Sequence, residues 1–416
     1  MSEPNRARAR AKLTSVWLGG TALLVVIGIV QSPGEAFRAS LSGLQVWWQQ
    51  VFPGLVPPLI LAELLAASGM LHGLAVLAEP LTRSLFRLPG SAGWAAAFGW
   101  AAGVPAGAKE TARLRDAGLL RDEDTPILLL LSHVPNPFLV VVIAGAGFLQ
   151  SPLLGWAVAA GVWSAAVLGA AVLSRLFRVG KPAASSGYAP KAGDGRFRQA
   201  AMAAGEARRE DGRPLGKQLA DGVTHAVATL MGVGGLMMMT SVVLRLIQLW
   251  IPGSDAWLAV PGLYEMHLGA YETGRSPLFE SAPAHAAALL AAALAWTGWS
   301  GLLQARAAFG AKPAFPWAKL IAGKLLQSAI ALLVTFPLAR AALAGEPAFG
   351  QAILSFYPFG GLAREAADAG GPLSSGWRHL PEMWLSGLCS LAVFLLLALL
   401  AVVIRPPRKR RPPDRK

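Results

Sequence analysis

Three titratable side chains interrupt apolar stretches of the sequence. Glu63 lies in FPGLVPPLILAELLAASG, and Glu265 and His267 are two residues apart in PGLYEMH. An ionisable group at membrane depth costs free energy and usually faces a pathway or a partner. We therefore consider Glu63, Glu265 and His267 as candidates for binding a proton or another coupling ion. The alternative for Glu265 and His267 is solvation at the membrane surface.

An asparagine between two prolines marks a second candidate site. Asn136 stands between Pro135 and Pro137 in SHVPNPFLV, shortly after Ser132 and His133. Proline has no N–H and leaves backbone carbonyls unpaired, while the asparagine amide both donates and accepts hydrogen bonds. This pattern suits substrate contact by Ser132, His133 and Asn136. The alternative is an ordinary proline kink with Asn136 facing a neighbouring helix.

Two segments rich in small residues each end in alanine followed by a cation. They are AGVPAGAK, residues 102–109, and WSGLLQAR, residues 299–306. If Lys109 and Arg306 face a cavity, their charge selects anions, and helix N-termini reinforce that selection. The alternative is that both extend to the lipid headgroups, as we expect of Lys324. The candidates for substrate contact in these segments are Gly103, Pro105, Gly107, Lys109, Ser300, Gln304 and Arg306.

Motifs for catalysis are not found. The sequence has no Gly-Lys-Ser/Thr loop for ATP and no His-Glu-x-x-His, and its histidines lack metal-ligand spacing. The single cysteine, Cys389, lies in the last apolar run and is expected to be a small buried hydrophobe. We expect no cofactor, no metal and no enzyme activity.

The composition indicates an integral membrane protein. Hydrophobic residues make up 54% of the 416 residues and charged residues only 14%, whereas a soluble domain has about 25% charged residues. The net charge of +14 is concentrated in residues 1–12, 175–217 and 405–416, which places these segments in the cytoplasm by the positive-inside rule. The expected surroundings are a lipid bilayer, and a nucleic-acid partner is not expected.

Apolar runs of the length that a bilayer crossing requires recur along the chain. Eight crossings return the chain to its starting side, which agrees with basic segments at both ends. The first run lacks a clean cleavage site, so we expect an uncleaved first crossing. Residues 31–45 and 341–383 then lie outside. The predicted crossings are residues 13–30, 46–70, 126–149, 153–177, 221–250, 283–305, 318–340 and 384–404.

Two further segments are apolar but unsuited to a straight crossing. Residues 91–108 are rich in glycine, contain Pro105 and have basic residues on both sides, which predicts a re-entrant hairpin. Residues 256–272 are short and polar and predict a second broken segment. In many transporters, broken segments surround the substrate in two related halves.

The expected fold is therefore all-α, a polytopic membrane helix bundle with two weakly similar halves and broken or re-entrant helices. The expected division of the chain is 1–45 for the N-terminus and first crossing, 46–177 and 221–340 for the two halves, 178–220 for a cytoplasmic linker, and 341–416 for an outer loop, the last crossing and a basic tail.

Several motifs, in this order, resemble the YlbJ family of sporulation integral membrane proteins, also called SpoVV. They are FPGLVPPLILAELLAASG, EPLTRSLFRLPG, GWAAGVPAGAKETARLRDAG, the Asn-Pro at Asn136, PGLYEMHLGA and GWSGLLQARA. The resemblance covers residues 46–340, and Gly103–Lys109 is its most specific element. The chain departs from the family pattern at His133 and Pro135, where Asn and Ser are more frequent.

The resemblance implies a nucleoside-recognition, or Gate, domain related to concentrative nucleoside transporters. It further implies a transporter that moves dipicolinate, a small organic dianion, from the mother cell across the outer forespore membrane. Lys109 and Arg306 would suit such a dianion. The alternatives are a nucleoside transporter of the same architecture and a non-transporting membrane scaffold in spore-envelope assembly.

Overall fold

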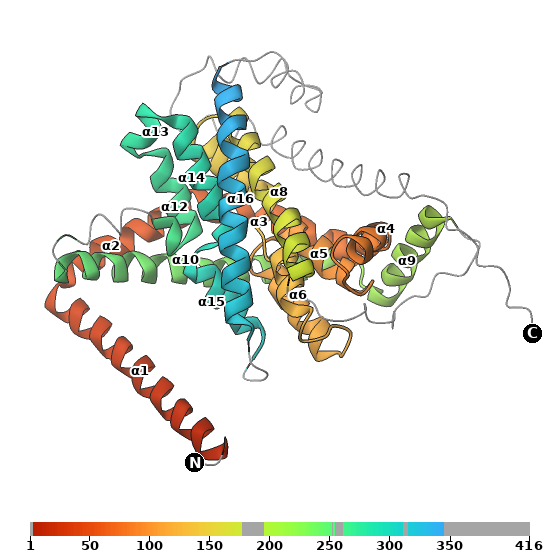
Figure 1. The fold of residues 1–416 in the computed structure, drawn as a ribbon, viewed down its shortest axis with the longest axis horizontal. Helices are drawn as coiled ribbons and strands as arrows, with labels where there is room; N and C mark the ends of the chain where they lie inside the picture. Colours follow the sequence, from red (N-terminus) through yellow and green to blue (C-terminus); the bar gives the residue numbers. More distant parts are fainter. Residues whose placement is uncertain (1–2, 177–194, 252, 254–260, 311–314, 345–416) are drawn as a thin grey trace, which may run out of the picture.

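The fold is helical throughout the part of the chain that can be described. The structure, a computed structural model, describes residues 3–176, 195–251, 253, 261–310 and 315–344. Every regular element in these ranges is a helix (Figure 1), which confirms the all-α class. Five helical stretches are long and apolar enough to cross a membrane, namely Pro33–Ala67, Pro152–Leu176, Leu215–Trp250, Pro283–Ala308 and Trp317–Leu343.

These five stretches overlap five of the eight predicted crossings, and Pro33–Ala67 begins 13 residues before the predicted crossing 46–70. The predicted crossing 13–30 lies within α1 (Glu3–Gln31), whose apolar part is Val16–Gln31. The predicted crossing 126–149 is divided into two shorter helices, as described below. The predicted crossing 384–404 lies outside the described residues.

Helices from both halves of the sequence pack together at the centre. α8 (Pro152–Leu176) lies along α16 (Trp317–Leu343), and α14 (Pro283–Trp296) packs against both. A Cβ added at Gly161 of α8 would lie 1.9 Å from Oγ1 of Thr335 on α16. The two helices therefore approach this closely because residue 161 has no side chain.

Two of the central crossings are broken. The first consists of α7 (Thr125–Ser132) and the π-helical η2 (Phe138–Phe148), separated by a non-helical stretch with two prolines. The second consists of α14 and α15 (Gly298–Ala308). This break corrects the expectation of a straight crossing over 283–305. It occurs because Thr297 and Gly298 have φ values of 68° and 70°, which no α-helix contains.

Residues 91–108 form two helices instead of one. α5 (Ala92–Ala102) and α6 (Ala106–Asp116) pack against each other, and Gly103 turns the chain with a φ of 80°. The chain therefore has the hairpin geometry that its glycines and proline predict. α6 also packs against α15, so the hairpin contacts the second broken crossing.

The predicted broken segment 256–272 is only partly described, because residues 254–260 lie outside the described ranges. Its described part contains η3 (Pro261–Leu263) and α12 (Met266–Gly274). A short helix, α13 (Pro277–Ser281), then leads into α14. Each of these helices is too short to cross a membrane alone.

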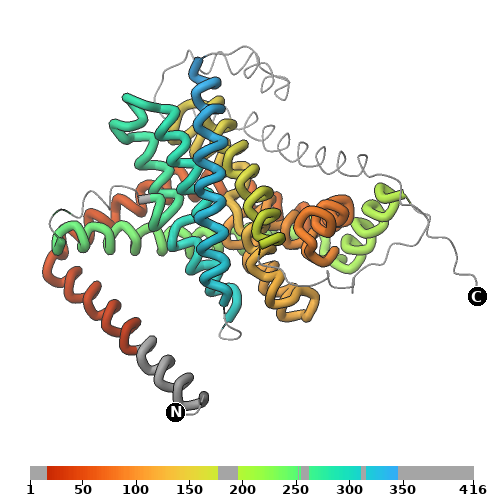
Figure 2. Tube along the Cα trace, in the orientation of Figure 1, coloured from red at the N-terminus to blue at the C-terminus, as the bar shows by residue number. Residues whose placement is uncertain are grey.

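The periphery is built from long helices with exposed apolar faces. α2 (Pro33–Val46), η1 (Trp47–Val51) and α3 (Phe52–Ala67) form one continuous helical stretch. Residues 33–45, which we expect to lie outside the membrane, are therefore helical and continue into the predicted crossing 46–70. α10 (Leu215–Trp250) packs along α2 and α3, and α1 leads away from the bundle (Figure 2).

The predicted linker between the halves contains an ordered helix. α9 (Arg196–Asp211) packs against α4 (Met70–Ser84). The turn between α9 and α10 is held by Arg213, which pairs with Asp211 and Asp221 at 2.6 Å each. The hydrogen bond from Arg213 holds the pKa of the Asp211 carboxyl below its usual range. The second half of the chain is thus fixed to α4 through α9.

Candidate transport site

The end of α7 is stabilised by three side chains from two other helices. The last carbonyl groups of a helix have no partner within the helix. Here Gln327 of α16 donates to the Leu130 carbonyl at 2.9 Å, and Trp100 of α5 donates to the Leu131 carbonyl at 2.8 Å. Lys324 of α16 donates to the His133 carbonyl at 2.7 Å. The carbonyl groups left unpaired by the first break therefore have hydrogen-bond donors from neighbouring helices.

Asn136 lies at the other end of the first break, just before η2, and bonds two backbone groups there. Its Oδ1 accepts a hydrogen bond from the Leu139 N–H at 2.8 Å, which caps η2, and its Nδ2 donates to the Ala102 carbonyl at 3.2 Å. The residue is buried, with 3% of its surface exposed. The amide thus joins the start of η2 to the tip of the α5–α6 hairpin.

The glycines of the hairpin allow close packing of the backbone. A Cβ at Gly107 would lie 1.9 Å from the Ser132 carbonyl oxygen, and one at Gly99 would lie 2.1 Å from it. The Ser132 hydroxyl lies 2.9 Å from Oγ1 of Thr111 and donates to the Gly107 carbonyl at 3.2 Å. Gly107 and Ser132, both proposed from sequence as substrate contacts, therefore contact each other in this structure.

The hairpin tip lies beside Asn136. A Cβ at Gly103 would lie 3.0 Å from the Asn136 Cβ. Pro105 follows a cis peptide bond from Val104 and is buried next to the start of α6. Of the residues proposed from sequence, Gly103, Pro105 and Asn136 are thus gathered in one place.

The second break is held from the neighbouring broken segment. The Ser300 N–H donates to the Tyr264 carbonyl at 2.9 Å, and the Trp296 indole donates to the Leu263 carbonyl at 3.0 Å. The Ser300 hydroxyl is buried and makes no hydrogen bond within the described residues. This hydroxyl is consequently free to bond a ligand or water.

Glu265 and His267 form a buried pair at the start of α12. The Glu265 carboxylate caps the helix by accepting from the Leu268 N–H at 2.7 Å, and its other oxygen lies 2.7 Å from Nδ1 of His267. Both side chains are at least 97% buried. This burial excludes the surface-solvation alternative for this conformation.

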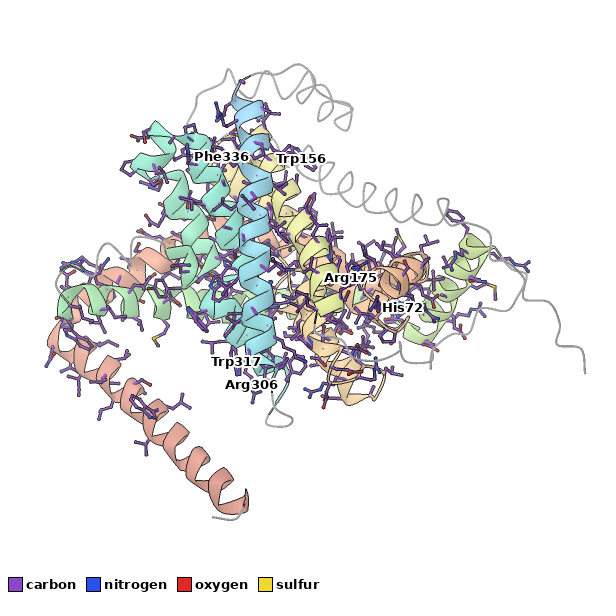
Figure 3. All side chains as sticks on the ribbon, in the orientation of Figure 1. His72, Trp156, Arg175, Arg306, Trp317 and Phe336 are labelled. Carbon is purple, nitrogen blue, oxygen red and sulfur yellow. The ribbon has the colours of Figure 1, made fainter. Side chains whose placement is uncertain are left out.

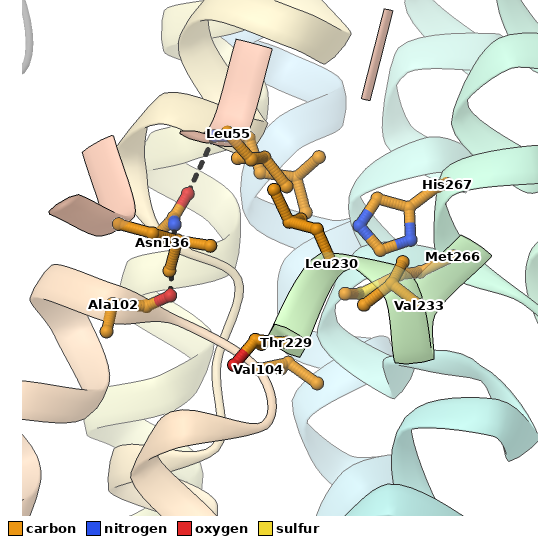
Figure 4. Close-up of a pocket in the computed structure, with 11 residues that line it drawn as sticks. Leu55, Ala102, Val104, Asn136, Thr229, Leu230, Val233, Met266 and His267 are labelled. Carbon is orange, nitrogen blue, oxygen red and sulfur yellow. Dashed lines mark hydrogen bonds between the residues drawn. The ribbon is translucent and has the colours of Figure 1, made fainter. Parts of the chain in front are cut away.

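A small pocket lies where the first break, the hairpin tip and the start of α12 meet α3 and α10 (Figure 4). In this view Asn136 and His267 are on opposite sides of Leu230. The pocket encloses about 310 Å³ of space not occupied by atoms, including open solvent. The enclosed part has room for about one water molecule. The lining residues are Leu55, Leu59, Ala102, Val104, Asn136, Leu139, Thr229, Leu230, Val233, Met266 and His267.

The proposed cations lie outside this lining. Lys109 is exposed on the first turns of α6. Arg306 of α15 donates to the Gly310 carbonyl and lies over the Phe315 ring, 5.9 Å from its centroid. Figure 3 places Arg306 at the same end of the bundle as Trp317. The two cations therefore do not surround a ligand space in this conformation, although α6 and α15 pack together.

Two other candidates are also away from the pocket lining. The Glu63 carboxylate on α3 faces Nδ1 of His225 on α10 at 3.8 Å, and its side chain is 34% exposed. Gln304 is half-buried on α15. These positions leave their proposed roles in ion coupling and substrate contact as predictions.

Lys324 is the functional candidate that sequence reasoning missed. We expected it to extend to the headgroups, but it is fully buried, and its ammonium donates to the His133 carbonyl and, at 3.3 Å, to the Ala295 carbonyl. The available signal was the spacing of Lys324 and Gln327, which are three residues apart and thus on one face of an otherwise apolar helix.

The chain is similar to a curated bacterial protein. It shares 35% identity over 247 residues with the sporulation integral membrane protein YlbJ of Bacillus subtilis (strain 168). The matched residues are 57% of this chain and 58% of that relative. The matched part is thus somewhat more than half the length of either protein. No family model and no solved structure matches the chain.

Proposed function

We propose, from the similarity to YlbJ, that the chain is a member of the YlbJ family and a sporulation membrane transporter for a small organic dianion. The proposed substrate is dipicolinate, and the proposed location is the outer forespore membrane, where the protein would move dipicolinate from the mother cell. The observation that carries the transport proposal is the meeting of the first broken crossing, the hairpin tip and the start of α12 at one pocket.

Broken helices at membrane depth support this proposal on physical grounds. Their unpaired backbone groups are tolerated only where protein or a water-filled cavity satisfies them, and transporters use such groups to bind substrate. In the closed conformation the Asn136 amide, the Glu265 carboxylate and the Tyr264 carbonyl each accept from an N–H near a helix start. A dianion would bind to these N–H groups after they separate from their internal acceptors.

Opening is required for this function, because the closed pocket is too small for an aromatic dicarboxylate. We propose that the hairpin α5–α6 moves away from Asn136 and enlarges the space. Lys109 on α6 and Arg306 on α15 would attract the dianion to the mouth of the pathway, since opposite charge raises the local concentration of a ligand. The Gate-domain relationship belongs to this proposal.

A nucleoside is the second candidate, and the lining of the pocket is the observation that favours it. The polar side chains there are the amide of Asn136, the hydroxyl of Thr229 and the imidazole of His267. Such groups form hydrogen bonds with neutral bases and sugars. A nucleoside would need no cation in the lining, whereas dipicolinate needs the charges at the mouth or the helix N-termini.

Uptake into vesicles tests the proposal. Purified protein is inserted into liposomes, and uptake of labelled dipicolinate and, separately, of labelled uridine and adenosine is compared with uptake into empty liposomes. We expect the uptake of labelled dipicolinate to be saturable and to decrease when unlabelled dipicolinate is added. Uptake of nucleosides alone would establish the second candidate. Uptake of neither would contradict transport and favour the scaffold function.

A further inference from the structure

The ammonium of Lys324 connects the ends of two broken helices. It donates to the His133 carbonyl at the end of α7 and to the Ala295 carbonyl in the last turn of α14. Both ends carry the partial negative charge of a helix C-terminus. A cation in this position therefore attracts both helix ends at once and holds α7, α14 and α16 together.

This ammonium has no acidic partner. Among the described residues, no carboxylate lies within 4 Å of its nitrogen. A buried charge without a counter-ion is costly, and lysines in such surroundings readily exchange a proton. The site is thus composed of a cation that can become neutral and two carbonyl groups whose bonds depend on its charge.

The neighbouring elements contribute few other charges. His133, directly after α7, is the titratable residue whose carbonyl accepts from the ammonium, and its Nε2 lies 3.0 Å from the Gly301 carbonyl oxygen. α14 contains only His285, which contacts Phe336, and α8 contains only Arg175, which donates to the Leu85 and Ala171 carbonyls. On α15, Arg306 donates to the Gly310 carbonyl. None of these elements supplies a carboxylate to Lys324.

We propose that Lys324 binds the coupling proton: as an ammonium it holds the two broken helices together, and as a neutral amine it lets them separate. The proton passes to water on the side toward which the pathway opens, and it returns from water when the pathway closes. The bonds weaken because a neutral amine donor is roughly half as strong as a charged one. This inference rests on the proposed transport function, but its test needs no substrate.

The test measures how accessible the α14 end is as pH changes. In a Cys389→Ser background, a reporter Ala295→Cys is labelled with a thiol reagent in the purified protein. Thiol reactivity itself rises with pH, so rates are divided by those of Ser68→Cys, an exposed position. We expect the ratio to rise with pH, by up to about tenfold per pH unit while the ammonium titrates.

Substitutions at position 324 separate a proton switch from a structural contact. Lys324→Arg keeps a charge that cannot be lost. In this variant the labelling rate of Ala295→Cys relative to Ser68→Cys should therefore stay low at every pH. Lys324→Met removes the bonds and should give a high ratio that does not change with pH. Lys319→Met, on the same helix, is the control and should follow the parent.

A pH-independent ratio in the parent, or a parental pH profile in Lys324→Arg, would overturn the proposal. If Lys324→Met fails to fold, as size-exclusion chromatography would reveal, the Lys324→Arg comparison still decides. The labelling result and the vesicle uptake are separate readouts. A pH-dependent ratio without any uptake would reject the transport function while leaving the proton switch in place.

Discussion

The helix is interrupted in both broken crossings, but by different residues and contacts. In the first, Pro135 and Pro137 remove N–H donors, and Asn136 supplies the cap for the helix that follows. In the second no proline is present, and Thr297 and Gly298 turn the chain with positive φ values. Its helix start is stabilised by the Tyr264 carbonyl from another segment.

The difference shows which breaks a sequence reveals. A break made by prolines is visible in the residues that form it. A break made by a left-handed threonine and a glycine is not, because threonine rarely adopts that conformation and tertiary contacts must impose it. The first break should therefore be sensitive to its own side chains, and the second to its neighbours.

The largest effect is expected where the first break meets the hairpin. Gly107→Ala would place a Cβ 1.9 Å from the Ser132 carbonyl oxygen, and both atoms belong to packed helices that must move apart. We expect a loss of about 3 kcal/mol or more of folding free energy, measured as the yield of monodisperse protein and its thermal midpoint. Gly232→Ala, with open space around it, should be neutral. Equal behaviour of the two variants would mean that the hairpin does not pack as described.

The next effect concerns the amide in the first break. Asn136→Ala removes the cap of η2 and the bond to the Ala102 carbonyl, and we expect a loss of about 2 kcal/mol. Asn136→Asp keeps the acceptor for the Leu139 N–H and should lose less. The thermal midpoints of the three proteins decide this point. If Asn136→Asp is as unstable as Asn136→Ala, the cap is not the important contact.

A cation follows the hairpin turn and another follows the second break. Lys109→Gln and Arg306→Gln should each insert normally and lower the apparent affinity for dipicolinate about tenfold, which corresponds to about 1.4 kcal/mol. The charge-preserving variants Lys109→Arg and Arg306→Lys should retain most uptake. Normal uptake by both Gln variants would mean that these cations only anchor the protein at the membrane surface.

The smallest effect on stability is expected within the second break. Ser300→Ala removes a hydroxyl without a described partner, while the backbone bond to Tyr264 remains. We expect a change within about 0.5 kcal/mol, seen as an unchanged thermal midpoint. A clear decrease in uptake by this stable variant would place the hydroxyl on the substrate. A clear loss of stability would show that Ser300 supports the break directly.

Much of the fold could be predicted from the residues, and less of the site. The apolar runs identified the long helices, and the glycines and proline of residues 91–108 identified the hairpin. The sequence did not reveal that α2 continues into the second crossing, because Glu35 and Arg38 are charged. In the structure they pair with each other, and Glu35 also pairs with Arg245 on α10. For Lys324, the spacing from Gln327 was the available signal, but its partners could not be foreseen. They are backbone carbonyl groups 191 and 29 residues away in the sequence, at the ends of broken helices.

We propose that substrate binds in the pocket where the first break, the hairpin tip and the start of α12 meet. Thr229 lines this pocket from α10, and Thr224 is an exposed residue on the same helix. In the Cys389→Ser background, thiol labelling of Thr229→Cys should become about tenfold slower when dipicolinate is present at ten times its Kd, while labelling of Thr224→Cys should not change. Labelling of Thr229→Cys at the same rate with and without dipicolinate, in protein that takes up dipicolinate, would contradict the claim.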